Sequence, residues 1–568
     1  MSIIHNPIIS GMAPDPSIIR VGGDYYIATS TFHWNPAIQI FHSTNLANWG
    51  LLTQVLKHDE VNLRGTNTPA GIWAPHLSFD KKTNKYWLAY SHMQNMAGRE
   101  FNADSFAMWA DDIKGPWSKP IYLTSIGFDP SLFHDQDGRH YLSILEWESR
   151  VGYQAPGHIV IAEVDLNNGN IIGGWHSVTT GFTTRGCVEA PQLYRHNDYY
   201  YLMLASGGTG YAHGIEMGRS KNIFGPYEPN PTNEPILTSS PHHLFSLGDP
   251  DAGHFEMYNP LSKIQKAGHG SLVQTPEDEW YIAHLMSRPL PNTKLNPLGR
   301  ETGLQKMVWD SRGWLTMVDG SNLAKSTVES PKSVQIAEQK PADSDVQDDF
   351  HEVTFDNHFM TPYRMQASSW VNTAESPNHL RIYGGNSFFS QVNPSIMATR
   401  ATSLNYTVQT SIEFQPHHFS QSAGLGLYYD ANNWLYARIC PSEKEDSRVL
   451  RILQAKLGER HDYKFSEVSI PEGPLQLKLI YHSGNVLFQY QSNGSKCWST
   501  IREAFDATYL SDEGVNGEPG EIGGFTGLFN FIGATDAFQH KSFADFEYYK
   551  VSNLDNSIIE RIIEKADK

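Results

Sequence analysis

The chain contains very little cysteine, no long hydrophobic run and no basic segment. Its 568 residues include three cysteines, Cys187, Cys440 and Cys497, whose odd number and wide spacing fit neither a disulfide framework nor a zinc site. The sequence contains no run of 18 apolar residues, the length that would indicate a membrane span. Its first residues lack the basic and apolar regions of a secretion signal. We therefore expect a cytoplasmic protein in a reducing compartment.

Positive charge is also scarce. The sequence has 43 Lys and Arg against 61 Asp and Glu, a formal net charge of −18, and no block of basic residues interrupts this excess. Nucleic acid and anionic membranes are therefore poor partners. Aromatic residues are plentiful at 12%, which fits a large β core and also a protein that stacks flat rings on a ligand. Composition alone favours the β core.

One strand motif occurs five times in the first half of the chain. The copies begin at Asp15, Ala74, Asp129, Ala190 and His269, and lie 55 to 79 residues apart. Each reads as a short strand, a polar turn and a second strand rich in aromatic and β-branched residues, which is a hairpin pattern. The repeat predicts an all-β fold that begins with a five-bladed β-propeller of four-stranded blades. A plain β-sandwich is the alternative.

Composition divides the chain into two domains. We expect the propeller over residues 1–324 and a linker over 325–346, because the latter segment is polar, contains proline and has almost no aromatic residues. Over 347–568 alternating strands separated by hairpin turns indicate a β-sandwich, a concanavalin-like jelly roll.

The last residues predict a short amphipathic helix. Ile559 and Ile563 lie on one face of it, and Asp555 or Asn556 caps its start. We expect this helix to dock on its own domain, with a partner subunit of a homo-oligomer as the alternative.

Equivalent positions of propeller blades form a ring around the central axis. The first motif position contributes Asp15, Asp129 and His269, and the position before it contributes Trp73 and Glu189. An Asp before Pro is ordinarily a turn or cap residue, and a buried structural ion pair is the main rival interpretation. Three carboxylates in register, with no Arg or Lys recurring beside them, instead point to a shared task.

Three carboxyl groups at one point suit the hydrolysis of a glycosidic bond. That reaction needs one protonated carboxyl group to donate to the leaving oxygen and one carboxylate to activate water or attack carbon. A third carboxylate raises the pKa of the acid by repulsion. His269 could bind a metal, a sugar hydroxyl or a water. Phe32, Trp34 and Trp73 could stack on a sugar ring or belong to the core.

At these residues the sequence resembles glycoside hydrolase family 43. The matching segments are NPIISGMAPDPS from Asn6, YYIATSTF from Tyr25, EAP from Glu189, GHGSLV from Gly268 and LGRET from Leu298. The resemblance implies a five-bladed propeller that hydrolyses with inversion, with Asp15 as general base, Glu189 as general acid and Asp129 as modulator of the acid's pKa. We expect no required cofactor, and name a structural divalent cation near His269 as the one candidate ion.

The resemblance also implies a substrate pocket that holds one terminal sugar of a small oligosaccharide. Arg300 and His269 would contact this sugar, and Phe32, Trp73 and Thr209 would line the pocket. A loop of the sandwich, GFTGLF from Gly524, would close it with Phe525 or Phe529 at its tip.

The sugar preference is predicted from one short segment. Well-known β-xylosidases of this group read Glu-Trp-Phe-Pro-Gly where this chain reads His33-Trp-Asn-Pro-Ala. An imidazole in place of a carboxylate changes the hydrogen bonds offered to sugar hydroxyls. We therefore predict an exo-acting α-L-arabinofuranosidase on arabinoxylan- or arabinan-type oligosaccharides. The alternatives are a β-D-xylosidase or a dual enzyme and, more remotely, a retaining transglycosidase or a carbohydrate-binding protein without catalysis.

Overall fold

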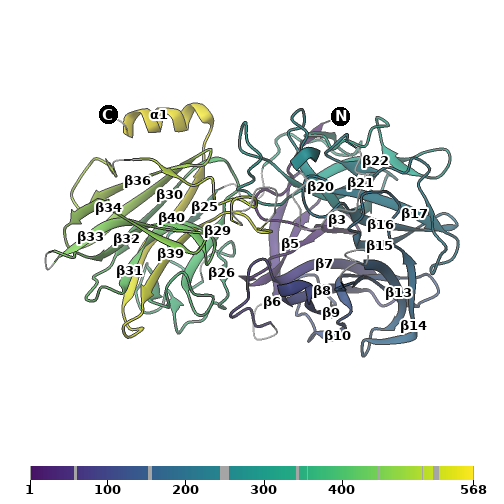
Figure 1. Cartoon of the computed structure of the whole chain (residues 1–568), viewed down its shortest axis with the longest axis horizontal. Coiled ribbons are helices and arrows are strands. Elements are labelled where there is room, and N and C mark those ends of the chain that lie inside the picture. The colour runs from purple at the N-terminus through teal and green to yellow at the C-terminus, as the bar shows by residue number, and fades with distance from the viewer. Residues whose placement is uncertain are drawn as a thin grey trace.

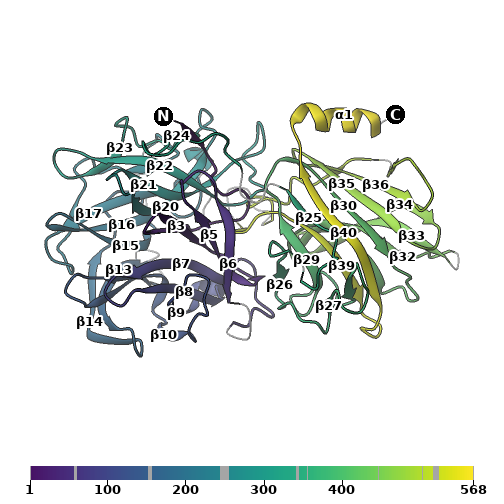
Figure 2. The same cartoon turned by 180° about the vertical axis from the view of Figure 1, so that it is seen from behind.

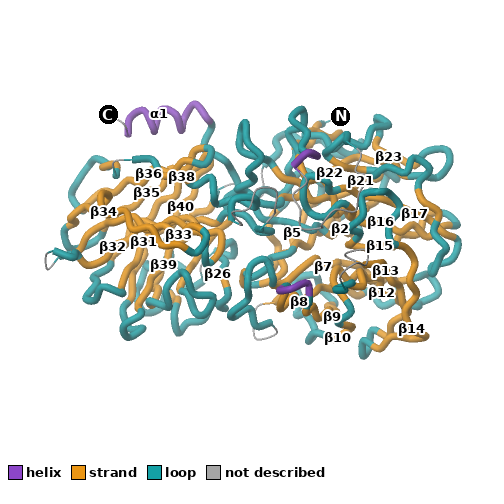
Figure 3. The backbone as a smooth tube through the Cα atoms, viewed as in Figure 1, coloured by secondary structure: helices purple, strands orange, loops and turns teal. Residues whose placement is uncertain are grey.

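The protein consists of two β domains placed side by side, with the propeller on the right in Figure 1 and the sandwich on the left; Figure 2 gives the reverse view. The computed structural model describes residues 2–56, 61–150, 157–242, 255–340, 345–354, 356–444, 447–501, 503–515 and 523–566. Nearly all regular structure is strand (Figure 3). Two 3₁₀ turns, Ala97–Arg99 and Phe255–Met257, and one helix complete the described elements, and no described helix is long and apolar enough to cross a membrane.

Five antiparallel sheets form the blades of the propeller, as the five-fold motif predicts; four have four strands and the fourth blade has a fifth short strand. The innermost strand of each blade is the motif strand, so the five motif copies surround the axis. From the first blade to the fifth the strands are β2 (Ser17–Val21), β3 (Asp24–Thr29), β5 (Ala37–Ser43), β6 (Gly50–Leu56); β7 (Gly71–Asp80), β8 (Lys85–Asn95), β9 (Asn102–Ala110), β10 (Ile121–Thr124); β11 (Gly127–His134), β12 (His140–Trp147), β13 (Gly157–Asp165), β14 (Asn170–Thr179); β15 (Glu189–His196), β16 (Tyr199–Ser206), β17 (Gly214–Ser220), β18 (Glu228–Pro229), with β19 (Leu237–Thr238) on β17; and β20 (Gln265–Gln274), β21 (Trp280–Ser287), β22 (Glu301–Trp309), β23 (Leu315–Met317).

The expected linker at 325–346 is partly a strand of the propeller. Within it β24 (Thr327–Glu329) pairs with the first strand, β1 (Ile3–His5). Val328 is buried between them, and Gln339 accepts a hydrogen bond from the His5 amide. A three-residue strand is too short to stand out from a polar, proline-containing segment, so composition alone could not separate it from a linker.

Two sheets form the sandwich, and a core of buried aliphatic and aromatic side chains lies between them. One sheet has the order β27 (Val371–Asn372), β28 (Leu380–Tyr383), β40 (Phe543–Asn553), β30 (Asn405–Glu413), β35 (Leu475–His482), β36 (Asn485–Ser492), β37 (Ser499–Thr500), with β25 (Val346–Asp348) on β40 and β38 (Phe505–Asp506) on β36. The other has the order β29 (Ser395–Arg400), β39 (Phe529–Asp536), β31 (Gln421–Asp430), β32 (Asn433–Pro441), β33 (Arg448–Lys456), β34 (Glu459–Ile470).

The helix α1 (Asn556–Ala566) lies on the sandwich, as Figures 1 and 2 both show. The Asp555 carbonyl accepts hydrogen bonds from the Ile558 and Ile559 amides, which starts the helix at the predicted place. Ile559 is fully buried against Ile480 and Leu487 of β35 and β36. The helix therefore docks on its own domain.

An apolar contact joins the two domains. The short strand β26 (Thr361–Pro362) of the second domain pairs with β4 (Trp34–Asn35) of the propeller. The Trp34 ring stacks on Phe529 of β39 with 3.7 Å between ring centroids, and both side chains are fully buried. One hydrophobic cluster thus continues from the propeller into the sandwich, and burial of this area favours a fixed arrangement of the domains.

A buried ion cluster lies beside this apolar contact. The ammonium group of Lys266 on β20 contacts Glu513 and is 3.6 Å from Asp512, and all three side chains are nearly inaccessible to solvent. Tyr429 donates a hydrogen bond of 2.6 Å to Asp512, and the Asn296 amide donates one of 2.8 Å to Glu513. The positive charge of Lys266, a propeller residue, thus compensates the negative charges of two sandwich carboxylates at a place that water does not reach.

We expect Lys266→Met to destabilise the protein by about 3–5 kcal/mol, because it leaves the buried carboxylates without their cation. The change is measured as the shift of the first transition in urea unfolding followed by tryptophan fluorescence. Lys325→Met is the control, since Lys325 and its partner Asp319 are both largely exposed and such a pair contributes less than about 1 kcal/mol. Equal shifts for the two variants would contradict the assignment.

Candidate active site

The five motif positions share an unusual backbone conformation. Their φ angles are positive: 55° at Asp15, 38° at Ala74, 60° at Asp129, 51° at Ala190 and 42° at His269. The strand register shifts at this point in four of the blades. Such a bulge changes the direction of a side chain relative to its sheet, and positive φ is costly for residues other than glycine. The repeat therefore maintains local strain where the carboxylates are presented.

A narrow pocket lies at this ring. It brings together all the site residues expected from the sequence except His33 and Phe529, and adds Phe128. Its lining consists of Asp15, Phe32, Trp73, Phe128, Asp129, Glu189, Thr209, His269, Arg300 and Phe525.

His33 and Phe529 lie near the pocket but outside its lining. The His33 ring is fully buried and stacks on Tyr363 with 4.8 Å between centroids. Burial lowers the pKa of His33 to about 3, so the ring is neutral. Phe529 is occupied by its stack on Trp34. Both side chains point into the contact between the two domains. The sequence of one segment does not reveal that direction, because the partner side chains lie in the other domain.

Three polar groups surround Asp15. Ser30 donates a hydrogen bond of 2.7 Å to one carboxylate oxygen, and the other oxygen is 3.5 Å from Arg300 and 3.4 Å from the His269 ring. Burial alone would raise the pKa of Asp15, but Arg300, His269 and Ser30 outweigh it and hold the pKa below its usual value. Asp15 is therefore ionised at neutral pH.

Asp129 has the opposite electrostatics. Its side chain is 6% exposed. Burial, and then the charges of Glu189 and Asp15, raise the pKa of Asp129 well above its usual value. Asp129 therefore keeps its proton at a pH at which Asp15 has lost its own. The pocket holds an ionised carboxylate and a protonated carboxyl group, which is the acid–base contrast that glycoside hydrolysis requires.

The sandwich supplies one wall of the pocket. Arg300 donates hydrogen bonds of 3.2 and 3.1 Å to the Phe525 carbonyl, and its guanidinium lies over the rings of Phe32 and Phe525. At Gly299 a β-carbon would meet the Thr526 carbonyl oxygen at 2.0 Å, so only glycine permits this approach. Of the two residues proposed for the loop tip, Phe525 is therefore the one that reaches the pocket.

Sequence reasoning did not select Phe128, Ser30 or His213 as site residues. Phe128 occupies the same motif column as Trp73 and Glu189, so the repeat carried a signal for it. Ser30 and His213 lie outside the motif columns, and their role is visible only through contacts. His213 Nδ1 donates a hydrogen bond of 3.0 Å to the Lys266 carbonyl, and the His213 ring fills the space that a side chain at position 268 would need.

The predicted cation near His269 stays a prediction. Among the described residues, the metal-binding side chains that gather in a group of three or more are Asp80, His134 and His140, and His269 is not one of them. The chemistry available in the pocket consists of proton transfers and a water attack, and it needs no cofactor.

A pocket with an ionised carboxylate, a protonated carboxyl group, a third carboxyl group and aromatic walls is that of a glycoside hydrolase. Two family models match the chain: "Glycosyl hydrolases family 43" over residues 4–315 and "Beta xylosidase C-terminal Concanavalin A-like domain" over residues 347–552. The chain belongs to glycoside hydrolase family 43.

Similar proteins cover the full length of this chain. It is 35% identical to "Beta-xylosidase" from Bacillus subtilis, over 96% of this chain and 99% of that protein. It is 30% identical to "Non-reducing end alpha-L-arabinofuranosidase BoGH43B" from Bacteroides ovatus, over 97% and 95%. The crystal structure of xylan β-1,4-xylosidase from Bacillus halodurans C-125 superposes with a TM-score of 0.89 at 35% identity and covers 97% of this chain and 100% of that one.

We expect Ser30→Ala to move the acidic limb of the pH profile of kcat/KM to higher pH. The variant loses the hydrogen bond that favours ionised Asp15, so the pKa of Asp15 rises and more acid-side activity is lost. The profile is recorded with an aryl glycoside.

Ser17→Ala is a matched control for this change. The Ser30 and Ser17 hydroxyls each accept a backbone N–H from β7, of Ala74 and Leu77 respectively, but the bond to Asp15 belongs to Ser30. A similar shift in both variants would mean that the blade contact, not the Asp15 bond, moves the limb.

Proposed function

We propose that the protein is an inverting exo-β-D-xylosidase that removes one terminal xylose at a time from xylan-type oligosaccharides. The observation that carries this proposal is the pocket itself. Carboxyl groups from three blades face a space for a single sugar, and Phe525 of the second domain forms part of its wall. Such a site suits chain ends rather than the middle of a polymer.

Asp15 is proposed as the general base. Its low pKa keeps it ionised, so it can take a proton from the water that attacks the anomeric carbon. Arg300 and His269 hold it in place and lie close enough to contact hydroxyls of the bound sugar.

Glu189 is proposed as the general acid, with Asp129 maintaining its proton. Asp129 is the more enclosed of the two, because Glu189 is partly exposed. A proton shared by the pair can therefore pass from Glu189 to the leaving oxygen, while Asp129 disfavours the loss of that proton before the substrate binds.

Xylose rather than arabinofuranose is the proposed sugar. The arabinofuranosidase prediction depended on His33 facing the substrate, and His33 instead stacks on Tyr363 outside the pocket lining. Relatives named for xylosidase activity, from Bacillus subtilis and a Vibrio species, are each 35% identical over 96% of this chain. These two observations support the xyloside alternative.

α-L-Arabinofuranosidase activity is the second candidate, as the main or an additional activity. A relative from Humicola insolens, 35% identical over 97% of this chain, carries the name "Xylosidase/arabinosidase 43B". Xylose and arabinofuranose are both pentoses of similar outline, so one pocket can accept either as the terminal sugar.

Asp15→Asn and Glu189→Gln are each expected to lower kcat/KM on xylobiose by about 10²- to 10⁴-fold, since each removes a proton-transfer group. Glu189→Gln should lose less on 4-nitrophenyl β-D-xyloside, because nitrophenolate leaves with little protonation. Retention of more than about a tenth of the rate on xylobiose by either variant argues against the assigned roles. Melting temperatures near that of the wild type establish that the variants fold.

Side-by-side assays of 4-nitrophenyl β-D-xyloside and α-L-arabinofuranoside test the sugar preference. We expect the higher kcat/KM on the xyloside. Proton NMR of the first product tests stereochemistry: α-xylose from a β-xyloside is the inverting result. An arabinofuranoside preference would restore the original prediction, and β-xylose as the first product would favour the retaining alternative.

A further inference from the structure

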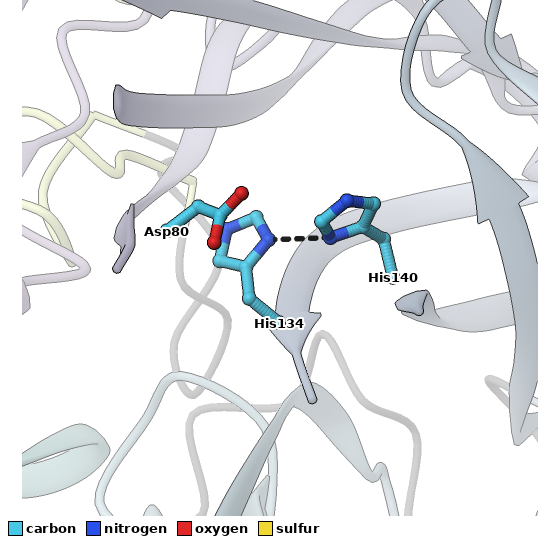
Figure 4. A group of neighbouring side chains, drawn as sticks. All are labelled: Asp80, His134 and His140. Carbon is cyan, nitrogen blue, oxygen red and sulfur yellow. Dashed lines mark hydrogen bonds between the residues drawn. The ribbon is translucent and has the colours of Figure 1, made fainter. Parts of the chain in front are cut away.

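A group of two histidines and one aspartate lies at the junction of the second and third blades, away from the pocket. Asp80 ends β7, His134 ends β11 and His140 begins β12, as Figure 4 shows. One ligand atom from each lies within 4.8 Å of the others, and the Nδ1 atoms of the two rings are 2.9 Å apart. We call these residues the Asp-His-His trio.

The two facing nitrogens cannot both carry hydrogen. At 2.9 Å two N–H groups would collide, so at least one ring presents a bare lone pair to the other. The Nε2 atom of His134 is 3.0 Å from the Ser78 hydroxyl, which fixes that ring when Nε2 donates to it. The Nδ1 lone pair of His134 then accepts the hydrogen bond from His140 that Figure 4 draws as a dashed line.

The next blade junction shows what these backbone positions do elsewhere in the same chain. One repeat later they are occupied by Asp135, Arg195 and Tyr200. Arg195 forms a 3.1 Å ion pair with Asp135, and Tyr200 donates a 2.7 Å hydrogen bond to it. Arg195 and Tyr200 are also paired across their strands, as His134 and His140 are across theirs. This second set compensates its buried carboxylate with a guanidinium.

The Asp-His-His trio has no such cation. Asp80 is 3% exposed, and among the described residues no Lys, Arg or His nitrogen lies within 4.0 Å of its carboxylate. Its oxygens accept hydrogen bonds from the Lys82 amide and the Thr83 hydroxyl of its own turn. Two neutral imidazoles and a carboxylate offer lone pairs where the neighbouring junction has a positive charge.

We propose that the Asp-His-His trio binds a divalent cation of the zinc type, which takes the place that Arg195 fills at the next junction. Two imidazole nitrogens and one carboxylate oxygen form a ligand set that zinc accepts, with water in the fourth position. Binding requires His140 to hold its proton on Nε2, the two Nδ1 atoms to move slightly apart from their 2.9 Å separation, and the Asp80 carboxylate to move toward them. The Ser78 hydroxyl orients His134 as an outer-shell partner.

The site is accessible and distant from the chemistry. His134 and Ser78 line an open cavity whose walls include residues of all five innermost strands. This cavity is the other mouth of the central channel. His134 follows Asp129 by five residues on β11, which places the two about 16 Å apart along the strand. The ion would join two blades and take no part in hydrolysis.

The test uses the full-length protein carrying Cys497→Ser, because the exposed thiol of Cys497 would itself bind zinc. The protein is treated with a chelator, dialysed against micromolar Zn²⁺ or Co²⁺ and analysed for bound metal. We expect one ion per chain, a melting temperature higher with metal than with chelator, and a Co²⁺ absorption spectrum of nitrogen and oxygen ligands. Failure to retain any ion would overturn the proposal and leave a hydrogen-bonded histidine pair.

Variants locate the ion. His140→Gln, at a partly buried side chain, should weaken binding about a hundredfold. The double variant His134→Arg with His140→Tyr copies the neighbouring junction, so it should retain no ion and fold with a melting temperature insensitive to metal. His42→Gln is the control, because His42 pairs with Asp24 without a third ligand. Undiminished binding by the double variant, or an equal loss in the control, would overturn the assignment.

Discussion

The guanidinium of Arg300 joins the parts of this enzyme on which the rest depends. It lies 3.5 Å from the Asp15 carboxylate in the propeller and donates to the Phe525 carbonyl in the sandwich. The Arg300 side chain thus stabilises the charge of Asp15 and holds the Phe525 wall that encloses it. The buried contact of Lys266 with Glu513 and the stack of Trp34 on Phe529 fix the two domains around it. The ionisation of Asp15 and the closure of the pocket therefore both depend on the contact between the two domains.

The five-fold repeat supplies both symmetry and exceptions to it. Every blade has positive φ at its first motif position, but the side chain there is carboxylate, methyl or imidazole according to the blade. The repeat therefore determines the backbone conformation at this position, and the residue type in each blade determines which chemical group it presents. The far end of the same strands repeats this logic, since Asp80 and Asp135 share a position while their partners differ.

Features carried by a repeated pattern could be predicted from the sequence, and contacts between segments could not. The propeller and the meeting of Asp15, Asp129 and Glu189 followed from one motif in register. The position of His33 did not, because its stacking partner Tyr363 lies 330 residues away in another domain. The strand β24 was too short to be recognised in its polar segment. The choice of Phe525 over Phe529 required the close approach at Gly299.

The order of synthesis gives the contact between Arg300 and Phe525 a further consequence. These two residues are separated by 225 positions, so a nascent chain exposes a finished propeller well before its last wall has left the ribosome. During that interval Trp34 lacks its stacking partner and the carboxylates face an open mouth. A chain terminated or clipped before Phe525 is therefore marked by exposed aromatic surface, which chaperones and proteases recognise, and a complete pocket is reserved for molecules translated past Phe529.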